Sequence, residues 1–530
     1  MFSSIYSGAV CGIRGQLVNV EADISDGFPS YTLVGYLASE VKEAKERVTT
    51  ALKNSGYYLP AKKIIINLSP AGVRKQGTAY DLPIAIAVLG ALGRIPQQDL
   101  THIFAIGELS LNGDLGPIRG ILPLVLMAKE QGIRQCLVPL RNAREARLVE
   151  GIEVIPLPDL KAACIYFQQG AEAYEAYMRD KCAIDTSGAY VPETAEAVRS
   201  SAASHGPKGP VEDFSDILGQ ETLKRAIIVA VSGMHHLLMI GPPGSGKSMS
   251  AHRIPGIMPA MTFDEQLEVT RLYSVAGILE GDCALVSQRP FRCPHHTVPI
   301  KAMTGGGTMP VPGEISLAHR GILFLDELAE FHPATLEVLR QPLEEGVITI
   351  NRLHGSFVFP ADFMLVAAMN PCKCGYYPDR SRCRCSPQDV SRYLHRISRP
   401  LLDRIDLCID VHPPKNDHYN KKKSALSTAQ MHAKVMEAKA VQEQRFKDTG
   451  IHFNSEIPAA AMDQYCRLTR PLKDHVDELA KIFGLSVRGR HKLLRVARTI
   501  ADLDGCESIG EPHLDEAACY RMIDKTYWEF

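Results

Sequence analysis

The chain has 530 residues, of which 45% are hydrophobic and 22% are charged, and its net charge is −1. This composition excludes a globally disordered chain, and the length exceeds what one hydrophobic core supports, so about two to four domains are expected. Because the net charge is near zero, any surface that binds nucleic acid must be local.

The cysteine content and the hydropathy pattern indicate the compartment. Fourteen cysteines are present, but only four are clustered, between residues 372 and 385. Scattered thiols are typical of a reducing cytosol. Residues 1–15 lack the features of a secretory signal, and the longest apolar run, 82–93, is shorter than the roughly 20 residues of a membrane span. We therefore expect a cytoplasmic protein with no membrane partner.

The first part of the chain alternates strand and helix patterns, which predicts an α/β domain over residues 1–184. The run 63–68 has the composition of a strand, and 41–52 has a helical pattern. Residues 185–210 are rich in Ala, Ser, Gly, Glu and Pro and show no sustained period. We interpret them as a linker.

Strand, loop and helix patterns return over residues 211–412, where the chemically informative motifs lie. Prolines and lysines mark 413–426 as a linker loop. Residues 427–530 read as helical, and within them 487–503 carries apolar residues at helical spacing with Arg and Lys between them.

The strongest motif follows an apolar strand at 237–240. It fits the phosphate-loop pattern G-x-x-x-x-G-K-[ST] at every fixed position, which predicts an ATP site. Glycines let the backbone present N–H groups to phosphate oxygens, the lysine adds positive charge, and the serine is expected to ligate Mg²⁺. The residues are Gly241, Pro242, Pro243, Gly244, Ser245, Gly246, Lys247 and Ser248.

About 80 residues later, an apolar strand ends in Asp326 and Glu327. This position predicts that Asp326 lies near Mg²⁺ and that Glu327 polarises the attacking water. Asn370 ends another apolar strand and is a candidate to contact the γ-phosphate, although a cap of the turn before Pro371 is the alternative. Arg404 is a candidate arginine finger, with a surface salt bridge as the equal alternative.

Several stretches together resemble the magnesium-chelatase-like AAA+ ATPases, and within them the ComM/YifB family. The most specific are 292–296 (RCPHH), 305–307 (GGG) and 312–319 (PGEISLAH), which lead into the acid pair, and 495–503 (RVARTIADL) near the end. The resemblance covers nearly the whole chain. It implies an AAA+ module over 211–412 with a helical lid over 427–530.

The resemblance also implies roles for single residues. Asn370 becomes the sensor-1 residue, Arg404 a finger acting on a neighbouring subunit as in the related MCM helicases, and Arg488 the sensor 2 of the lid. A finger acting between subunits implies the hexameric ring of the family. ComM proteins are similar to helicases that drive branch migration of single-stranded or branched DNA during natural transformation. A chelatase-like motor that remodels a protein partner is the alternative.

The N-terminal domain resembles the Lon protease fold, on the stretches 75–81 and 107–113. Ala79 stands where Lon has its nucleophilic serine, and Leu122 where it has its catalytic lysine. Neither side chain can act as nucleophile or base, so we predict that this domain is catalytically inert.

Two C-x-C pairs follow Asn370 directly, within 372–385. Four thiolates in two close pairs can bind Zn²⁺ tetrahedrally, although C-x-C is tighter than the usual C-x₂₋₄-C spacing. Free thiols are the alternative, and a disulfide does not suit the cytosol. The candidate ligands of structural zinc are Cys372, Cys374, Cys383 and Cys385.

Two segments are candidates for gripping DNA phosphates in a pore. The insertion before the acid pair contributes Arg289, Arg292 and Lys301. The alternating segment 348–358 predicts a hairpin whose Arg352 and His354 point into the pore, with a solvated hairpin tip as the alternative. The basic residues of 488–498 are expected to serve the lid and subunit contacts instead.

Overall fold

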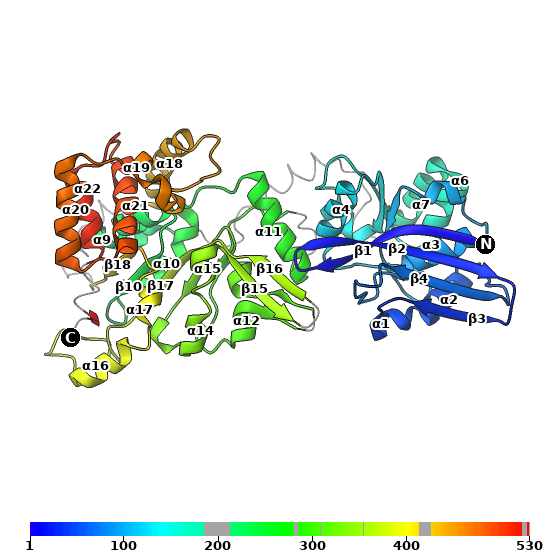
Figure 1. The fold of residues 1–530 in the computed structure, drawn as a ribbon, viewed down its shortest axis with the longest axis horizontal. Helices are drawn as coiled ribbons and strands as arrows, with labels where there is room; N and C mark the ends of the chain where they lie inside the picture. Colours follow the sequence, from blue (N-terminus) through cyan, green and yellow to red (C-terminus); the bar gives the residue numbers. More distant parts are fainter. Residues whose placement is uncertain are drawn as a thin grey trace. The chain divides into compact units, whose positions relative to one another are not determined.

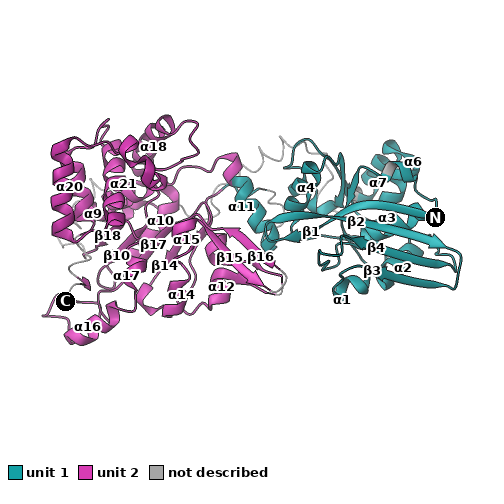
Figure 2. Cartoon of the chain, in the orientation of Figure 1, with its two compact units in different colours: residues 1–206, 266–287 teal, residues 207–265, 288–530 magenta. Residues whose placement is uncertain are grey.

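The computed structural model describes residues 1–184, 212–279, 285–307, 309–352, 355–412, 426–521 and 527–528. The chain forms two compact units, Met1–Gly206 with Gln266–Ser287, and Pro207–Glu265 with Gln288–Phe530 (Figure 2). The predicted linkers 185–210 and 413–426 lie outside the described residues except for Leu426, so the domain boundaries stay predictions. Among the described helices, none has the length and apolar character needed to cross a membrane.

A seven-stranded mixed sheet in the order β3-β4-β2-β1-β5-β8-β9 is the framework of the first unit. Figure 1 shows the long β1 and β2 beside β4. β1 and β2 form a long antiparallel hairpin, and β2 also pairs antiparallel with β4, whereas the other neighbours are parallel. The predicted strand at 63–68 is confirmed as β4. The strands are β1 (Phe2–Cys11), β2 (Arg14–Ser25), β3 (Ser30–Val34), β4 (Lys63–Ser69), β5 (Ile103–Ala105), β8 (Gln135–Pro139) and β9 (Glu153–Leu157), beside the short pair β6 (Glu108–Leu109) and β7 (Leu115–Gly116).

Helices pack on this sheet, and one of them is buried on all sides. Every residue of α3 is buried because the helix lies between the β1–β2 hairpin and α2, which explains its uniformly apolar sequence. The helical pattern predicted at 41–52 is confirmed as two consecutive helices, α1 and α2. The helices are α1 (Ser39–Lys42), α2 (Ala44–Asn54), α3 (Asp81–Ala91), α4 (Ile121–Glu130), α5 (Ala143–Ala146), α6 (Leu160–Gln169) and α7 (Ala171–Ile184).

The second unit is built on a five-stranded, wholly parallel sheet in the order β11-β14-β17-β10-β18. β10, β14 and β17 are buried along their whole length, as expected for a sheet covered on both faces. The apolar strands predicted before the phosphate loop, the acid pair and Asn370 are therefore confirmed. The strands are β10 (Leu237–Ile240), β11 (Phe291–Arg292), β14 (Ile322–Leu325), β17 (Met364–Met369) and β18 (Leu407–Asp410).

Helices and two small hairpins surround this sheet. The predicted hairpin at 348–358 is confirmed as the antiparallel pair β15–β16, in which Arg352 is opposite Gly355. The elements are α9 (Glu221–Gly233), α10 (Lys247–Arg253), α11 (Phe263–Ala276), α12 (Ile300–Thr304), β12 (Gly305–Gly306), β13 (Val311–Pro312), α13 (Glu314–Leu317), α14 (Pro333–Glu337), α15 (Pro342–Glu345), β15 (Val347–Arg352), β16 (Gly355–Pro360), α16 (Pro387–Leu394) and α17 (Arg399–Leu402).

The C-terminal part of the second unit is helical, as predicted. α21 occupies the predicted range, and Ser486 caps its N-terminus by accepting a hydrogen bond from Gly489 N at its side chain. Its apolar stripe packs on α9, α18 and α22 and joins the core of the parallel sheet. The helices are α18 (Thr428–Arg445), α19 (Met462–Tyr465), α20 (Arg470–Phe483), α21 (Val487–Leu503) and α22 (Glu511–Cys519).

Candidate nucleotide-binding site

The phosphate loop joins β10 to α10 at the carboxyl edge of the parallel sheet, where open α/β sheets bind ligands. Gly244 and Gly246 adopt φ angles of 76° and 91°, a region that favours glycine. Gly241 has no room for a side chain, because a Cβ there would lie 2.2 Å from the carbonyl oxygen of Val411. The glycines are therefore required for the loop conformation.

Lys247 lies inside this loop. Its ammonium donates to the carbonyl oxygens of Gly241 and Pro242 at 2.8 and 2.9 Å and lies 3.4 Å from Asn370 Oδ1. Burial lowers the pKa of Lys247, while the charge of Asp326 acts in the opposite direction. The structure thus brings together the lysine of the loop and the asparagine at the end of β17, as their positions in the sequence predict.

Ser248 and Asp326 meet beside the loop, because β14 lies in the same sheet as β10 with only β17 between them. The Ser248 hydroxyl donates to Asp326 Oδ2 at 2.6 Å, and the other carboxylate oxygen accepts the backbone N–H of Glu327 at 2.9 Å. Hydroxyl and carboxylate oxygens are ligands that Mg²⁺ prefers. The residues present therefore fit a magnesium–nucleotide complex.

Glu327 has a partner that the sequence does not reveal. Its backbone is left-handed, with φ of 52°, and its side chain is 56% exposed. His296 Nδ1 lies 3.3 Å from Glu327 Oε2, and the His296 ring packs on that of His295 at 4.1 Å between centroids. The histidine pair in 292–296 was the available signal, but nothing in its spacing identifies the acid pair as the contact.

Arg404 and Arg488 converge on one carboxylate, that of Glu344 in α15. Arg404 pairs with Glu344 Oε2 and donates to the carbonyl of Pro400 at 2.6 Å, and Arg488 Nη1 lies 2.9 Å from Glu344 Oε1. The hydrogen bond from Arg404, aided by the charge of Arg488, lowers the pKa of Glu344. The structure therefore brings these two arginines together, although they are 84 positions apart in the sequence.

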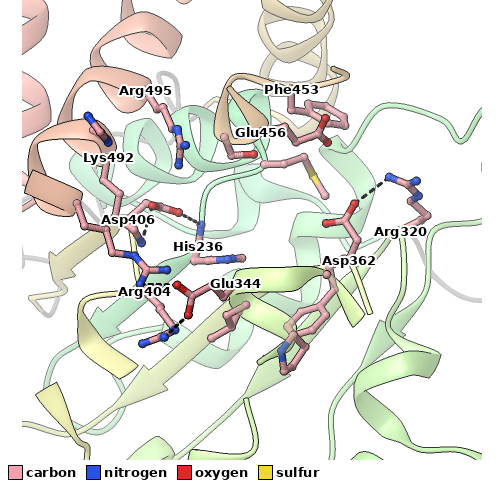
Figure 3. A pocket seen from close by; sticks show the side chains of 18 of the residues that line it. His236, Arg320, Glu344, Asp362, Arg404, Asp406, Phe453, Glu456, Lys492 and Arg495 are labelled. Atoms are coloured by element: carbon pink, nitrogen blue, oxygen red, sulfur yellow. Dashed lines mark hydrogen bonds and ion pairs between the residues drawn. The ribbon is translucent and has the colours of Figure 1, made fainter. Parts of the chain in front are cut away.

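These three residues line a cavity of about 550 Å³ between the sheet core and the helical part of the second unit (Figure 3). Arg320 and Asp362, paired at 2.9 Å, line another part of it. The cavity is separate from the phosphate loop, because residues 241–248 do not line it. Among the described residues, the hydrogen bonds and ion pairs of Arg404 and Arg488 are not made to that loop.

A buried ion pair holds α21 against the sheet core at the wall of this cavity. Lys492 Nζ lies 2.9 Å from Asp406 Oδ1, and the other carboxylate oxygen accepts the N–H of His236 at 2.8 Å. Burial alone would raise the pKa of Asp406, but the charges of Lys492 and His236 outweigh it and hold this pKa well below its usual range. The buried Asp406 carboxylate therefore depends on Lys492 of α21 to remain ionised.

Comparisons with known proteins cover nearly the whole chain. Family models described as "Magnesium chelatase, subunit ChlI", "Subunit ChlI of Mg-chelatase" and "Magnesium chelatase, subunit ChlI C-terminal" match residues 213–419, 20–142 and 425–521. The competence protein ComM of Haemophilus influenzae is 39% identical over 522 residues, which cover 98% of this chain and 97% of that protein. The chain belongs to the ComM/YifB family of magnesium-chelatase-like AAA+ ATPases.

Other relatives agree with this assignment. The uncharacterized protein YifB of Escherichia coli is 40% identical over 524 residues, which cover 99% of this chain and 97% of that protein. The magnesium-chelatase 38 kDa subunit of Rhodobacter capsulatus is 25% identical over 358 residues, which cover 61% of this chain and 91% of that subunit. The α/β architecture with a parallel sheet and a helical C-terminal part is that expected of a P-loop AAA+ module with its lid.

The residues predicted to contact DNA in this ComM/YifB member differ in burial and in ion pairing. Arg289 is 5% exposed and paired with Glu265 at 3.0 Å, so it is withdrawn from any surface. The guanidinium of Arg292 pairs with both carboxylate oxygens of Glu314 at 2.7 Å. His354 lies outside the described residues.

Lys301 and Arg352 remain as exposed cations, and they come from the two predicted segments. Lys301 lies on α12, which runs directly into β12, and Arg352 Nε donates to the carbonyl of Gly307, just after β12, at 3.3 Å. The structure thus brings the end of β15 to the inserted segment. Their proximity was not predicted.

In the N-terminal unit, the two positions compared with Lon are structural. The carbonyl of Ala79 accepts the N–H of Gly107 at 2.9 Å. Leu122 is fully buried in α4, and its N–H donates to Glu145 Oε1 at 3.2 Å. A catalytically inert domain stays a prediction, supported by the chemistry of these side chains.

Proposed function

We propose that this protein is an ATP-dependent DNA translocase that drives branch migration as a hexameric ring in the cytoplasm, in recombination during natural transformation. The observation that carries the ATPase half is the meeting of Lys247, Ser248, Asp326 and Asn370 around the phosphate loop. A competence role is supported by the printed name of the Haemophilus relative. DNA as the cargo is supported by the family resemblance and by the exposed cations at 301 and 352.

The residues of the site divide the work of hydrolysis. Lys247 and the N–H groups of 241–248 bind the phosphates, and Ser248 with Asp326 would hold Mg²⁺, which supplies charge neutralisation at the phosphates. Glu327, exposed at the edge of the site, orients and polarises the attacking water. Asn370 positions the γ-phosphate as sensor 1.

A ring is proposed because two of the three proposed catalytic cations, Arg404 and Arg488, lie away from Lys247 and its loop. Arg404 and Arg488 meet at Glu344 in a cavity that residues 241–248 do not line. A phosphate on a neighbouring subunit is an anion to which both guanidiniums can donate hydrogen bonds, with Arg404 as the finger and Arg488 as sensor 2. A heterologous contact repeated around a closed ring would supply every site with both arginines.

ATPase measurements with and without DNA test the proposal. We expect single-stranded and branched DNA to stimulate hydrolysis and Lys247→Ala to abolish it. Electron microscopy with a slowly hydrolysed ATP analogue is expected to show six-membered rings. An ATPase indifferent to DNA would refute DNA translocation and favour the alternative, a chelatase-like motor that remodels a protein partner.

The DNA-contacting surface has its own test. Replacing both Lys301 and Arg352 by alanine removes two phosphate contacts, so the slope of log affinity against log salt should become shallower by about 1.4 for single-stranded DNA. The matched control replaces Lys434 and Lys447, which are exposed on and after α18. An unchanged slope in the first variant, or an equal change in the control, would contradict this placement.

A further inference from the structure

The segment 372–385 lies between β17 and α16 and contains no helix or strand. Cys372 is fully buried and Cys383 is 6% exposed. Short turns shape the backbone, with hydrogen bonds from Gly375 N to the carbonyl of Cys372 at 2.9 Å and from Cys383 N to that of Asp379 at 2.8 Å. A bound metal can stabilise a segment of this kind, because its binding free energy contributes directly to folding.

The four thiols converge on one point. The Sγ atoms of Cys372, Cys374, Cys383 and Cys385 all lie within 4.8 Å of one another. The separations from Cys372 to Cys374 and Cys383 are 3.3 and 3.8 Å, and that from Cys374 to Cys383 is 3.5 Å. Zn–S bonds of about 2.3 Å in a tetrahedron place sulfur atoms about 3.8 Å apart. The cluster therefore has the dimensions of a shell around one ion.

We propose that Cys372, Cys374, Cys383 and Cys385 bind one structural Zn²⁺ ion, and that this ion fixes the position of the segment against the phosphate loop. A single thiophilic ion suits four thiolates at these separations, whereas a cluster of several iron atoms would hold its cysteines farther apart. The sulfur atoms are also too far apart for a disulfide, whose S–S distance is about 2.05 Å. Four thiolates leave no open coordination position, so the ion has no catalytic role.

The link to the ATP site is a direct packing contact. Gly375 has φ of 83°, and a Cβ at this position would lie 2.5 Å from Cδ of Pro243 in the phosphate loop. The backbone of the segment 372–385 therefore packs directly against the phosphate loop at Pro243. The segment also begins two residues after Asn370, whose side chain lies near Lys247. Loss of the ion would release both the loop and the sensor asparagine.

Two arginines of the segment contact its own backbone and its two tyrosine rings. Arg380 donates to the carbonyl of Cys385 at 2.9 Å, and its guanidinium lies over the ring of Tyr377 at 5.0 Å. Arg382 lies over the ring of Tyr376 at 4.1 Å. These contacts tie the backbone at Cys385 and the rings of Tyr376 and Tyr377 to the loop that carries the thiols, and such supporting contacts help to fix the ligands of a structural metal site.

Metal content of the purified full-length chain tests the site. We expect about one zinc ion per wild-type chain, almost none in the Cys374→Ser/Cys383→Ser variant, and an unchanged content in Cys506→Ser/Cys519→Ser, where both thiols are exposed and outside the cluster. Protein produced with cobalt should show the visible absorption of tetrahedral cobalt thiolate, so the wild type alone gives an answer if the serine variant does not fold. Less than half a zinc ion per wild-type chain, iron in its place, or equal zinc in the serine variant would overturn the assignment.

The coupling to the phosphate loop rests on the proposed ATPase function and is tested separately. Gly375→Ala is expected to keep its zinc and lose at least tenfold in ATP hydrolysis, because the added Cβ displaces Pro243. Full ATPase activity in this variant would refute the coupling while leaving the zinc site intact. A wild-type chain that contains zinc but hydrolyses no ATP would instead refute the proposed function alone.

Discussion

The ion pair between Lys492 and Asp406 gives the sharpest prediction about how the helical lid is held. Both side chains are nearly buried, at 7% and 9% exposure, and their charged atoms lie 2.9 Å apart. Lys492→Met removes the ammonium and leaves the Asp406 carboxylate buried, where it still accepts the backbone N–H of His236. Breaking a buried pair in this way costs about 3–5 kcal/mol. At 1.36 kcal/mol per factor of ten, the unfolding equilibrium constant should rise at least about 100-fold.

The single tryptophan of the chain makes this measurable. Trp528 is 4% exposed and donates from Nε1 to the carbonyl of Leu394 at 3.1 Å, so its fluorescence reports on the second unit. Urea unfolding followed by this signal is expected to shift strongly in Lys492→Met. Adding Asp406→Asn should restore most of the loss, because the neutral amide still accepts from His236 and no buried charge remains. A loss below about 1 kcal/mol in the single variant, or additive losses in the double variant, would refute the reasoning.

Three further predictions concern other carboxylates and their partners. Burial raises the pKa of Glu145 to about 7, so the free energy of unfolding of the first unit should fall as pH rises from about 4.5 to 7. Glu145→Gln should therefore stabilise the first unit by up to about 3 kcal/mol at pH 8 but not at pH 4, as measured by thermal unfolding. His296→Ala frees the Glu327 carboxylate and should raise ATP hydrolysis without DNA and reduce stimulation by DNA; equal rates in both conditions would contradict this. Glu344→Gln releases Arg404 for contact with a neighbouring subunit, so half-maximal ATPase activity should be reached at a lower protein concentration. The change should be up to about fivefold, since an exposed ion pair contributes at most about 1 kcal/mol. An unchanged dependence on protein concentration would argue that Glu344 does not compete with the neighbouring subunit for Arg404.

The sequence predicts local features well, because they depend on short-range rules. The phosphate loop, the strands around it and the extent of α21 follow from motif and period, which involve neighbours in the chain. The cysteine spacing likewise predicts that four thiols lie close together. For each of these features the structure adds geometry but not a new residue.

Contacts between distant segments could not be predicted. Glu344, between Arg404 and Arg488, belongs to no motif, and the partner of Glu327 is a histidine 31 positions earlier. Arg289 shows a second limit: residue type suggests exposure, but pairing with Glu265 allows an arginine to be buried. Such pairings depend on packing between elements that a single sequence does not specify.

The path of the chain between the two compact units limits how the protein can be divided. Gln266–Ser287 belongs to the first unit although it follows the phosphate loop, and the carbonyl of Ser274 accepts the N–H of Gly120 at 3.1 Å. A fragment that ends at residue 184 would lack this piece, and one that starts at 212 would carry it without the surface it packs on. Neither half contains a complete compact unit, so gene fragments cut at the linker should each yield a poorly soluble protein. Co-expression of both halves should restore a soluble pair.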